Sequence, residues 1–134
     1  MKKKQKGMEG QEHSKISKVV KIRSRESWEY YITHATNHGY PIMVHFSACW
    51  CMPSIAISPF FEELASTYQH ILFLMVDVDE IKEVASKLGI KAMPTLVLIS
   101  GGAPMDKIVG ANPKEIRKMM DAFLHSPHNK SSSP

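Results

Sequence analysis

The hydrophobic residues of this chain alternate between two spacings, and this alternation constrains its fold more than any other feature. Short apolar runs typical of buried strands are separated by segments in which apolar residues recur every three or four positions, as along one face of a helix. Strands are expected over residues 19–22, 41–46, 71–78, 95–99 and 105–109, and helices around residues 28–38, 57–68, 81–88 and 113–124. This order predicts an α/β domain with a central mixed five-stranded sheet flanked by four helices.

The connections between these segments predict the direction of the strands. Strands joined through a helix are expected to be parallel, whereas Gly101-Gly102 permits a tight turn that makes the last two strands antiparallel neighbours. Residues 71–78 form the most apolar run and are therefore expected to be the central strand. Asp79 is expected to cap the next helix, and Asn112 to cap the last one.

The net charge of the chain comes from one end. Lys and Arg number 17 against 13 Asp and Glu, a net charge of +4. Six lysines and two glutamates fall within residues 1–18, which leaves 11 basic and 11 acidic residues in the remainder. A neutral body argues against nucleic-acid binding. We expect a disordered basic tail over residues 1–14, one domain over residues 15–125 and a disordered polar tail over residues 126–134.

Nothing in the sequence predicts a membrane protein or a metal protein. The longest apolar run has six residues (71–76), whereas a bilayer-spanning helix needs about 20, and no apolar secretory region follows the N-terminal lysines. Two cysteines so close in sequence suggest reduced thiols with a chemical role, and none of the seven histidines has metal-ligand spacing near them. We therefore expect a cytoplasmic protein, monomeric, without a metal or cofactor.

The candidate site follows the strand expected over residues 41–46. The chain there reads Cys49-Trp50-Cys51-Met52-Pro53-Ser54. Cys51 is expected where the strand turns into a helix, so that its sulfur faces free backbone N–H groups and the positive end of the helix dipole, both of which favour a thiolate. Trp50 adds a flat apolar surface suited to an extended peptide. The alternative is a buried, inert cysteine.

Four further features accompany this segment. They are Pro59, Val76-Asp77-Val78-Asp79, Ala92-Met93-Pro94-Thr95 and Val109-Gly110-Ala111. Together with the cysteine segment they resemble the thioredoxin superfamily from residue 18 to about residue 125, and in particular the plant thioredoxin-like proteins of CxxS type. The resemblance implies the thioredoxin fold and a cis Met93–Pro94 peptide facing Cys51. The substrate-binding residues that it implies are Trp50, Met52, Pro53, Met93, Pro94, Gly110 and Ala111.

The main departure from thioredoxin lies at the second catalytic cysteine, where this chain has Ser54. A serine hydroxyl cannot attack a disulfide at neutral pH, so a mixed disulfide on Cys51 must be resolved by another thiol. That thiol can belong to the same protein substrate, which amounts to disulfide isomerisation, or to an external molecule such as glutathione. With Cys51 and Ser54 as the catalytic positions, the resemblance thus implies monothiol exchange on protein substrates, with isomerase activity favoured over reductase activity.

Two other positions near the site are accessory candidates. The buried aspartate of thioredoxin aligns with His45, and its lysine partner with Met75, so the resemblance implies that the ion pair is lost. His45 is either a proton shuttle near neutral pH or, as we favour, a neutral core histidine with one hydrogen bond. Cys49 could form a strained disulfide with Cys51, although a strand-to-helix turn should aim the two side chains apart.

Two other functions are compatible with parts of the pattern. The first is a non-catalytic peptide-binding or chaperone-like module regulated by glutathionylation of Cys51. The second, a monothiol glutaredoxin, is disfavoured because Gly101-Gly102 precedes a strand instead of opening a helix, and because Trp50 and Met52-Pro53 follow the thioredoxin pattern.

Overall fold

The computed structural model describes residues 18–125, so the two expected tails lie outside the described residues. Strands and helices follow one another in the expected order. They are β1 (Val19–Ile22), α1 (Arg25–His38), β2 (Ile42–Ser47), α2 (Met52–Thr67), β3 (Leu72–Asp77), α3 (Lys82–Lys87), β4 (Thr95–Ser100), β5 (Ala103–Val109) and α4 (Pro113–Leu124). No helix within residues 18–125 is long and apolar enough to cross a membrane.

The five strands form one mixed sheet in the order β1-β3-β2-β4-β5. The β1, β2 and β3 strands are parallel, and β4 and β5 are antiparallel to their neighbours, as the connections predict. The prediction that residues 71–78 form the central strand is wrong, because β2 holds that place. All six residues of β2 are buried. Three of the six residues of β3, namely Leu72, Met75 and Asp77, are only partly buried.

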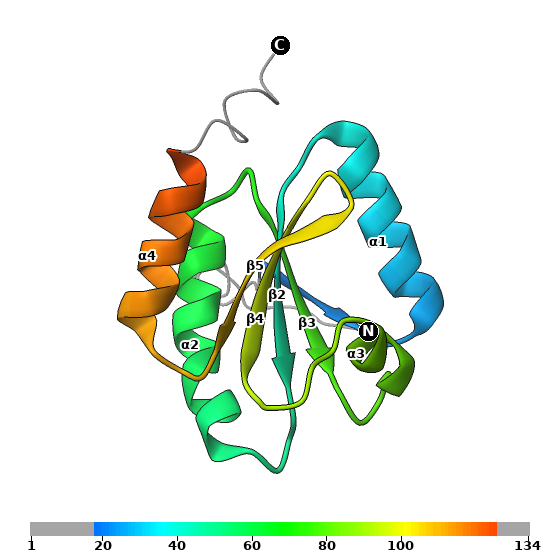
Figure 1. Cartoon of the computed structure of the whole chain (residues 1–134), viewed down its shortest axis with the longest axis vertical. Helices are drawn as coiled ribbons and strands as arrows, with labels where there is room; N and C mark the ends of the chain where they lie inside the picture. Colours follow the sequence, from blue (N-terminus) through cyan, green and yellow to red (C-terminus); the bar gives the residue numbers. More distant parts are fainter. Residues whose placement is uncertain (1–17, 126–134) are drawn as a thin grey trace, which may run out of the picture.

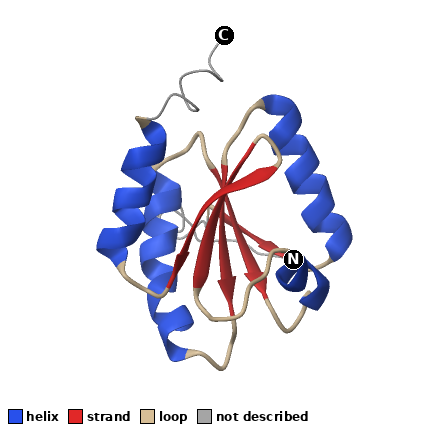
Figure 2. Cartoon of the chain, in the orientation of Figure 1, coloured by secondary structure: helices blue, strands red, loops and turns tan. Residues whose placement is uncertain are grey.

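Helices cover both faces of the sheet (Figures 1 and 2). Because side chains alternate along a strand, successive residues of β2 contribute to different cores. Val44 and Phe46 pack with Trp28 of α1 and Val84 of α3. Met43 lies on the opposite face, in the core that α2 and α4 complete.

The starts of α3 and α4 test the two helix caps that were predicted from the sequence. Asn112 caps α4 as predicted, since its Oδ1 accepts hydrogen bonds from the backbone N–H groups of Lys114 and Glu115 at 3.0 and 3.3 Å. The predicted cap at Asp79 is wrong, because α3 begins after Ile81 without any side-chain cap. The carboxylate of Asp79 has a different partner, described below.

The fold brings the carboxyl ends of β2 and β3 to one end of the molecule, together with the start of β4 (Figure 1). At the end of β2 the chain passes through residues 48–51 and enters α2 directly. In open sheets flanked by helices, this end of the parallel strands is where ligands commonly bind. The topology therefore places both cysteines at the carboxyl end of the parallel strands, where a site is expected.

Candidate functional site

Three connections meet around Cys51. It is the N-cap residue of α2, at the end of the β2–α2 connection. Its Sγ lies 3.3 Å from the carbonyl oxygen of Met93 and donates a hydrogen bond to it. The Met93–Pro94 peptide bond is cis, and the carbonyl oxygen of Pro94 accepts a bond from the N–H of Gly110 at 2.8 Å. Two backbone carbonyls thus link the thiol to the β5–α4 connection.

The thiol of Cys51 is partly exposed to solvent. Its position at the N-cap agrees with the sequence, but its sulfur does not accept a bond from the first turn of α2 and donates to Met93 instead. Because Pro53 has no N–H group, Met52 and Ser54 supply the free N–H groups of this turn. In the structure the thiol is therefore held by the carbonyl of Met93.

Cys49 is exposed and not bonded to Cys51. The two cysteines are free thiols in the structure, with Trp50 between them. Cys49 belongs to the turn before α2. Only Cys51 is tied to the other two connections.

Trp50 is held by Asp79, a contact that was not predicted from the sequence. Its Nε1 donates to Oδ2 of Asp79 at 2.6 Å, and the N–H of Asp79 donates to Oδ1 of Asp77 at 2.8 Å. These bonds connect the tryptophan to the end of β3. Asp79 was expected to cap a helix, and only the meeting of two loops far apart in sequence could have indicated its contact with Trp50.

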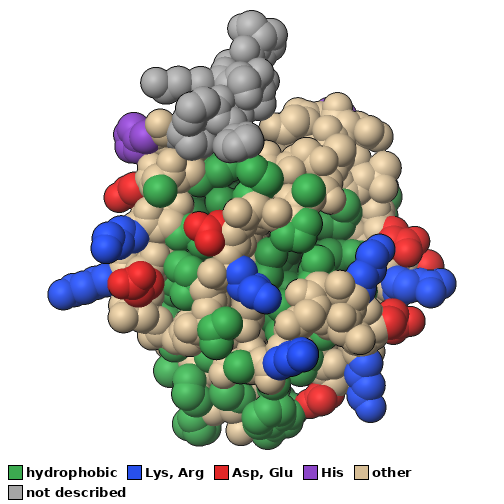
Figure 3. Space-filling view, viewed as in Figure 1, with side chains coloured by type: hydrophobic (Ala, Val, Ile, Leu, Met, Phe, Trp, Pro, Cys, Tyr) green, Lys and Arg blue, Asp and Glu red, His purple; other side chains and the backbone are tan. Residues whose placement is uncertain are grey.

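An exposed apolar surface borders Cys51. Trp50 and Met52 are 62% and 71% exposed, and Ile55 and Val109 are also largely exposed. We call these four side chains the apolar rim. Figure 3 shows hydrophobic side chains gathered at the lower end of the molecule, where β2 leads into α2. Exposed apolar surface of this kind commonly marks a site for another protein.

The expected substrate-binding residues do not all offer side chains to this surface. Trp50, Met52 and Pro53 are exposed beside Cys51. Pro94 is buried, Met93 and Gly110 are partly buried, and Ala111 packs against the core of α2 and α4. Ile55 and Val109 were missed, although Ile55 lies one turn after the exposed Met52 in α2.

Ser54 lies beneath the site, with only 1% of its surface exposed. It begins the inward face of α2 that continues with Ile57 and Phe61. Its Oγ is buried and has no hydrogen-bond partner within residues 18–125. The position three residues after the thiol is therefore directed inward and holds a group that is neither charged nor paired.

His45 lies in the layer between β2 and α2. It is 1% exposed, and its ring contacts that of Phe61 with centroids 5.2 Å apart. Burial lowers the pKa of His45 from 6.5 to about 4, because the charged form would lose its hydration. The ring is therefore neutral at pH 7, which favours the core histidine over the proton shuttle. The expected hydrogen bond is not made at Nε2, which has no partner within the described part of the chain.

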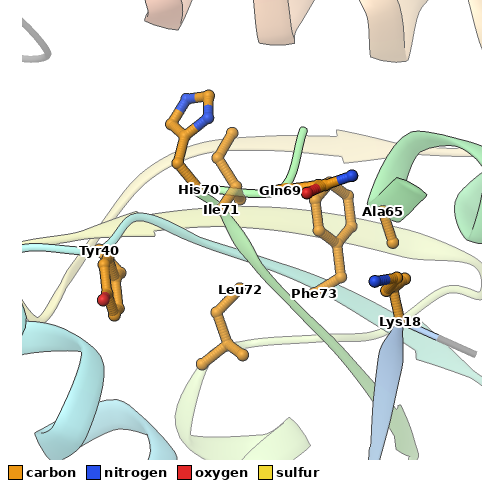
Figure 4. Close-up of a pocket in the computed structure, with 8 residues that line it drawn as sticks. All are labelled: Lys18, Tyr40, Ala65, Gln69, His70, Ile71, Leu72 and Phe73. Carbon is orange, nitrogen blue, oxygen red and sulfur yellow. The ribbon is translucent and has the colours of Figure 1, made fainter. Parts of the chain in front are cut away.

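A cavity of about 500 Å³ lies at the other end of the sheet. Its lining comes from the end of α2, the beginning of β3 and the residues before β2 (Figure 4). It contains neither cysteine, so it does not belong to this site. Within residues 18–125 no group of three or more His, Cys, Asp or Glu side chains could hold a metal ion.

Taken together, the mixed sheet with helices on both faces and a thiol opposite a cis proline define a thioredoxin-fold protein with one thiol in its Cys-x-x-Ser segment. A family model described as thioredoxin matches residues 18–122. The thioredoxin-like protein CXXS1 of Arabidopsis thaliana is 55% identical over 111 residues, covering 83% of this chain and 94% of its own length. The CXXS1 protein of rice is 52% identical over 110 residues, covering 82% and 83%.

A solved structure is similar over the same region. The crystal structure of a wild-type poplar thioredoxin h, PtTrxh4, has a TM-score of 0.78 and 37% sequence identity, covering 81% of this chain and 98% of that one. The chain therefore belongs to the thioredoxin family, as a thioredoxin-like protein of the plant CxxS type. Membership of this family supports thiol–disulfide oxidoreductase activity on protein substrates.

Proposed function

We propose that this protein exchanges disulfides in protein substrates through Cys51 alone, and that it isomerises disulfides better than it reduces them. The observation that carries the proposal is the pairing of a partly exposed thiol at Cys51 with a buried, unpartnered hydroxyl at Ser54. The first group can attack a substrate. The second cannot release it.

The proposed reaction begins when the thiolate of Cys51 attacks one sulfur of a substrate disulfide. The sulfur–sulfur bond of the substrate breaks, one substrate cysteine leaves as a thiolate, and the other is joined to Cys51. The free N–H groups of Met52 and Ser54 would stabilise the thiolate before attack. The apolar rim supports the binding of an apolar, extended segment of the substrate beside the thiol.

Release from Cys51 requires a second thiol. A thiolate of the same substrate can attack the mixed disulfide, form a new substrate disulfide and return Cys51 as a thiolate, which is isomerisation. An external thiol, for which we propose glutathione, can instead attack Sγ of Cys51, so that the substrate leaves as a thiolate and Cys51 is joined to glutathione. A second glutathione then frees Cys51 as a thiolate and leaves as oxidised glutathione. Because Cys51, Met93 and Gly110 come from one chain, we propose that the monomer acts. The two free thiols favour a cytoplasmic location.

Two assays on the same preparations test the proposal. Insulin reduction with thioredoxin reductase measures reductase activity, and reactivation of scrambled ribonuclease measures isomerase activity. We expect the Cys49→Ser variant to reactivate ribonuclease as the unchanged protein does, and to reduce insulin only weakly. Cys51→Ser should abolish both activities. Strong insulin reduction by Cys49→Ser would contradict the proposal.

The rival function is a non-catalytic binding module with Cys51 as a site of glutathionylation. The apolar rim is compatible with it, since such a surface binds peptides without any chemistry. The two functions differ in the effect of Cys51→Ser on ribonuclease. Reactivation that survives this substitution would favour the module.

A further inference from the structure

A second cavity, of about 400 Å³, lies against α3 and the segment that leads from α3 to Met93. Its apolar wall includes Val78 and Ile90, and its charged lining consists of Asp79, Lys82 and Lys91. Within residues 18–125 neither lysine has an ion-pair partner. The size is within the range of about 300 to 1,000 Å³ common for small-molecule sites. We call it the α3 cavity.

Two residues of the α3 cavity contact the segment that carries the thiol. Met93, which lines the cavity, accepts the hydrogen bond from Cys51 Sγ at 3.3 Å. Asp79, also in the lining, accepts the bond from Trp50 at 2.6 Å. None of the four side chains of the apolar rim lines the cavity. A protein segment held on the rim would therefore leave the cavity accessible.

The charges of the cavity match one class of small thiol. Its lining carries two ammonium groups and one carboxylate, and one oxygen of that carboxylate is already bonded to Trp50. Glutathione carries two carboxylates, one ammonium group and the thiol that an exchange reaction needs. Unpaired lysines in a recess attract carboxylates and raise the local concentration of an anionic ligand.

We propose that the α3 cavity binds glutathione, with Lys82 and Lys91 facing its carboxylates, and directs its thiolate to Cys51. This inference rests on the proposed function, because it supplies the external thiol that the mixed disulfide requires. Glutathione is thereby selected over small thiols that lack carboxylates.

The reaction consumes two molecules of glutathione for each substrate cysteine released. The first thiolate attacks Sγ of Cys51 in the mixed disulfide. The bond to the substrate sulfur breaks, the substrate leaves as a thiolate, and Cys51 is joined to glutathione. A second glutathione thiolate attacks the glutathione sulfur of this disulfide, which yields oxidised glutathione and the free thiolate of Cys51. Two glutathione thiols are oxidised and one substrate disulfide is reduced.

The test compares two thiols on the same adduct. The full chain with Cys49→Ser is joined through Cys51 to an uncharged cysteine peptide, and the rate of peptide release is measured with glutathione and with mercaptoethanol. The ratio of the two rates reports the recognition of carboxylates, because any change in the reactivity of the adduct itself cancels. Lys82→Gln with Lys91→Gln should lower this ratio by between about twofold and thirtyfold, the range expected for two exposed ion pairs.

Lys87→Gln is the matched control, since Lys87 is an exposed lysine of the same helix that does not line the α3 cavity. It should leave the ratio unchanged, and added salt should lower the ratio of the Cys49→Ser protein. A ratio that stays the same in the double variant, or falls equally in Lys87→Gln, would overturn the cavity as the glutathione site. If no peptide adduct forms at Cys51, the proposed function itself fails, and this site with it.

Discussion

Ser54 and His45 leave the interior beneath Cys51 without a charged group at pH 7. Ser54 carries a hydroxyl, and burial keeps His45 neutral. A dithiol mechanism needs a proton acceptor for its second thiol, whereas a single thiol needs none at this position. The resemblance aligns the buried aspartate and lysine of thioredoxin with His45 and Met75 of this chain. Because both charges are lost together, neither is left buried without its partner. The two residues are therefore consistent with a site that captures substrates through Cys51 alone.

The buried ring of His45 should make the stability of the protein depend on pH. Its pKa is about 4 in the folded chain and about 6.5 in an unfolded one, so the unfolded state binds the proton first as the pH falls. The free energy of unfolding should therefore decrease between about pH 6.5 and pH 4, by about 3 kcal/mol in total. Above pH 6.5 both states are neutral at this residue, and its contribution is constant.

Urea unfolding over this pH range checks the prediction, with His45→Phe as the comparison. Phenylalanine keeps a ring against Phe61 but cannot titrate. The difference in unfolding free energy between the two proteins should change steadily from pH 6.5 to pH 4. A difference that is the same at every pH would contradict a buried, neutral His45.

The sequence indicated some of these residue roles and not others. Cys51 could be identified because it lies in a short segment where a strand passes into a helix, and Ser54 because the resemblance to thioredoxin places it at the position of the second cysteine. The bond between Trp50 and Asp79 could not be predicted. It depends on where two loops 29 positions apart meet, and a cap is the usual role of an aspartate before a helix.

At the scale of elements, the site depends on how β2 passes into α2. Every residue of β2 is buried, so the strand cannot shift without exposing one of the two cores. The α2 helix begins at Met52, so Cys51 is its N-cap residue, and the helix continues through Pro59. A rigid strand and a long helix thus hold the thiol against the Met93 carbonyl.

The number and type of elements could be predicted because each has its own period. The central strand could not, because it is set by pairing between distant segments, whereas apolar content is a local property. β2 includes His45 and Ser47 and is therefore less apolar than β3, yet β2 has parallel and antiparallel neighbours on its two sides.

The cap of α4 allows a prediction for a single element. Asn112→Ala removes the acceptor for two backbone N–H groups of the first turn and should lower the free energy of unfolding by about 1 kcal/mol. Asn112→Asp keeps an oxygen in the same place and should unfold at nearly the same urea concentration as the unchanged protein. Equal midpoints for the alanine and aspartate variants would show that the cap contributes nothing.

On the scale of the whole molecule, features with different chemistry are arranged around one thiol. The apolar rim offers a surface for a protein substrate, and the α3 cavity offers charges for a small anionic thiol. The cavity of about 500 Å³ lies at the opposite end and contains neither cysteine. Basic and acidic residues are equal in number after residue 18. A protein substrate should therefore bind to the rim by apolar contact, and its affinity should depend little on salt.

We expect Cys51 to capture a substrate that no other group within residues 18–125 releases. Intact-mass measurement tests this on the Cys49→Ser protein, mixed with a disulfide-bonded peptide and then separated from the released peptide thiol. We expect an adduct of one peptide that persists until glutathione or another thiol is added. In the same background, Ser54→Cys should lose the peptide unaided and form an internal disulfide. If the adduct on Cys49→Ser disappeared as fast without added thiol as with it, release by an external thiol alone would be contradicted.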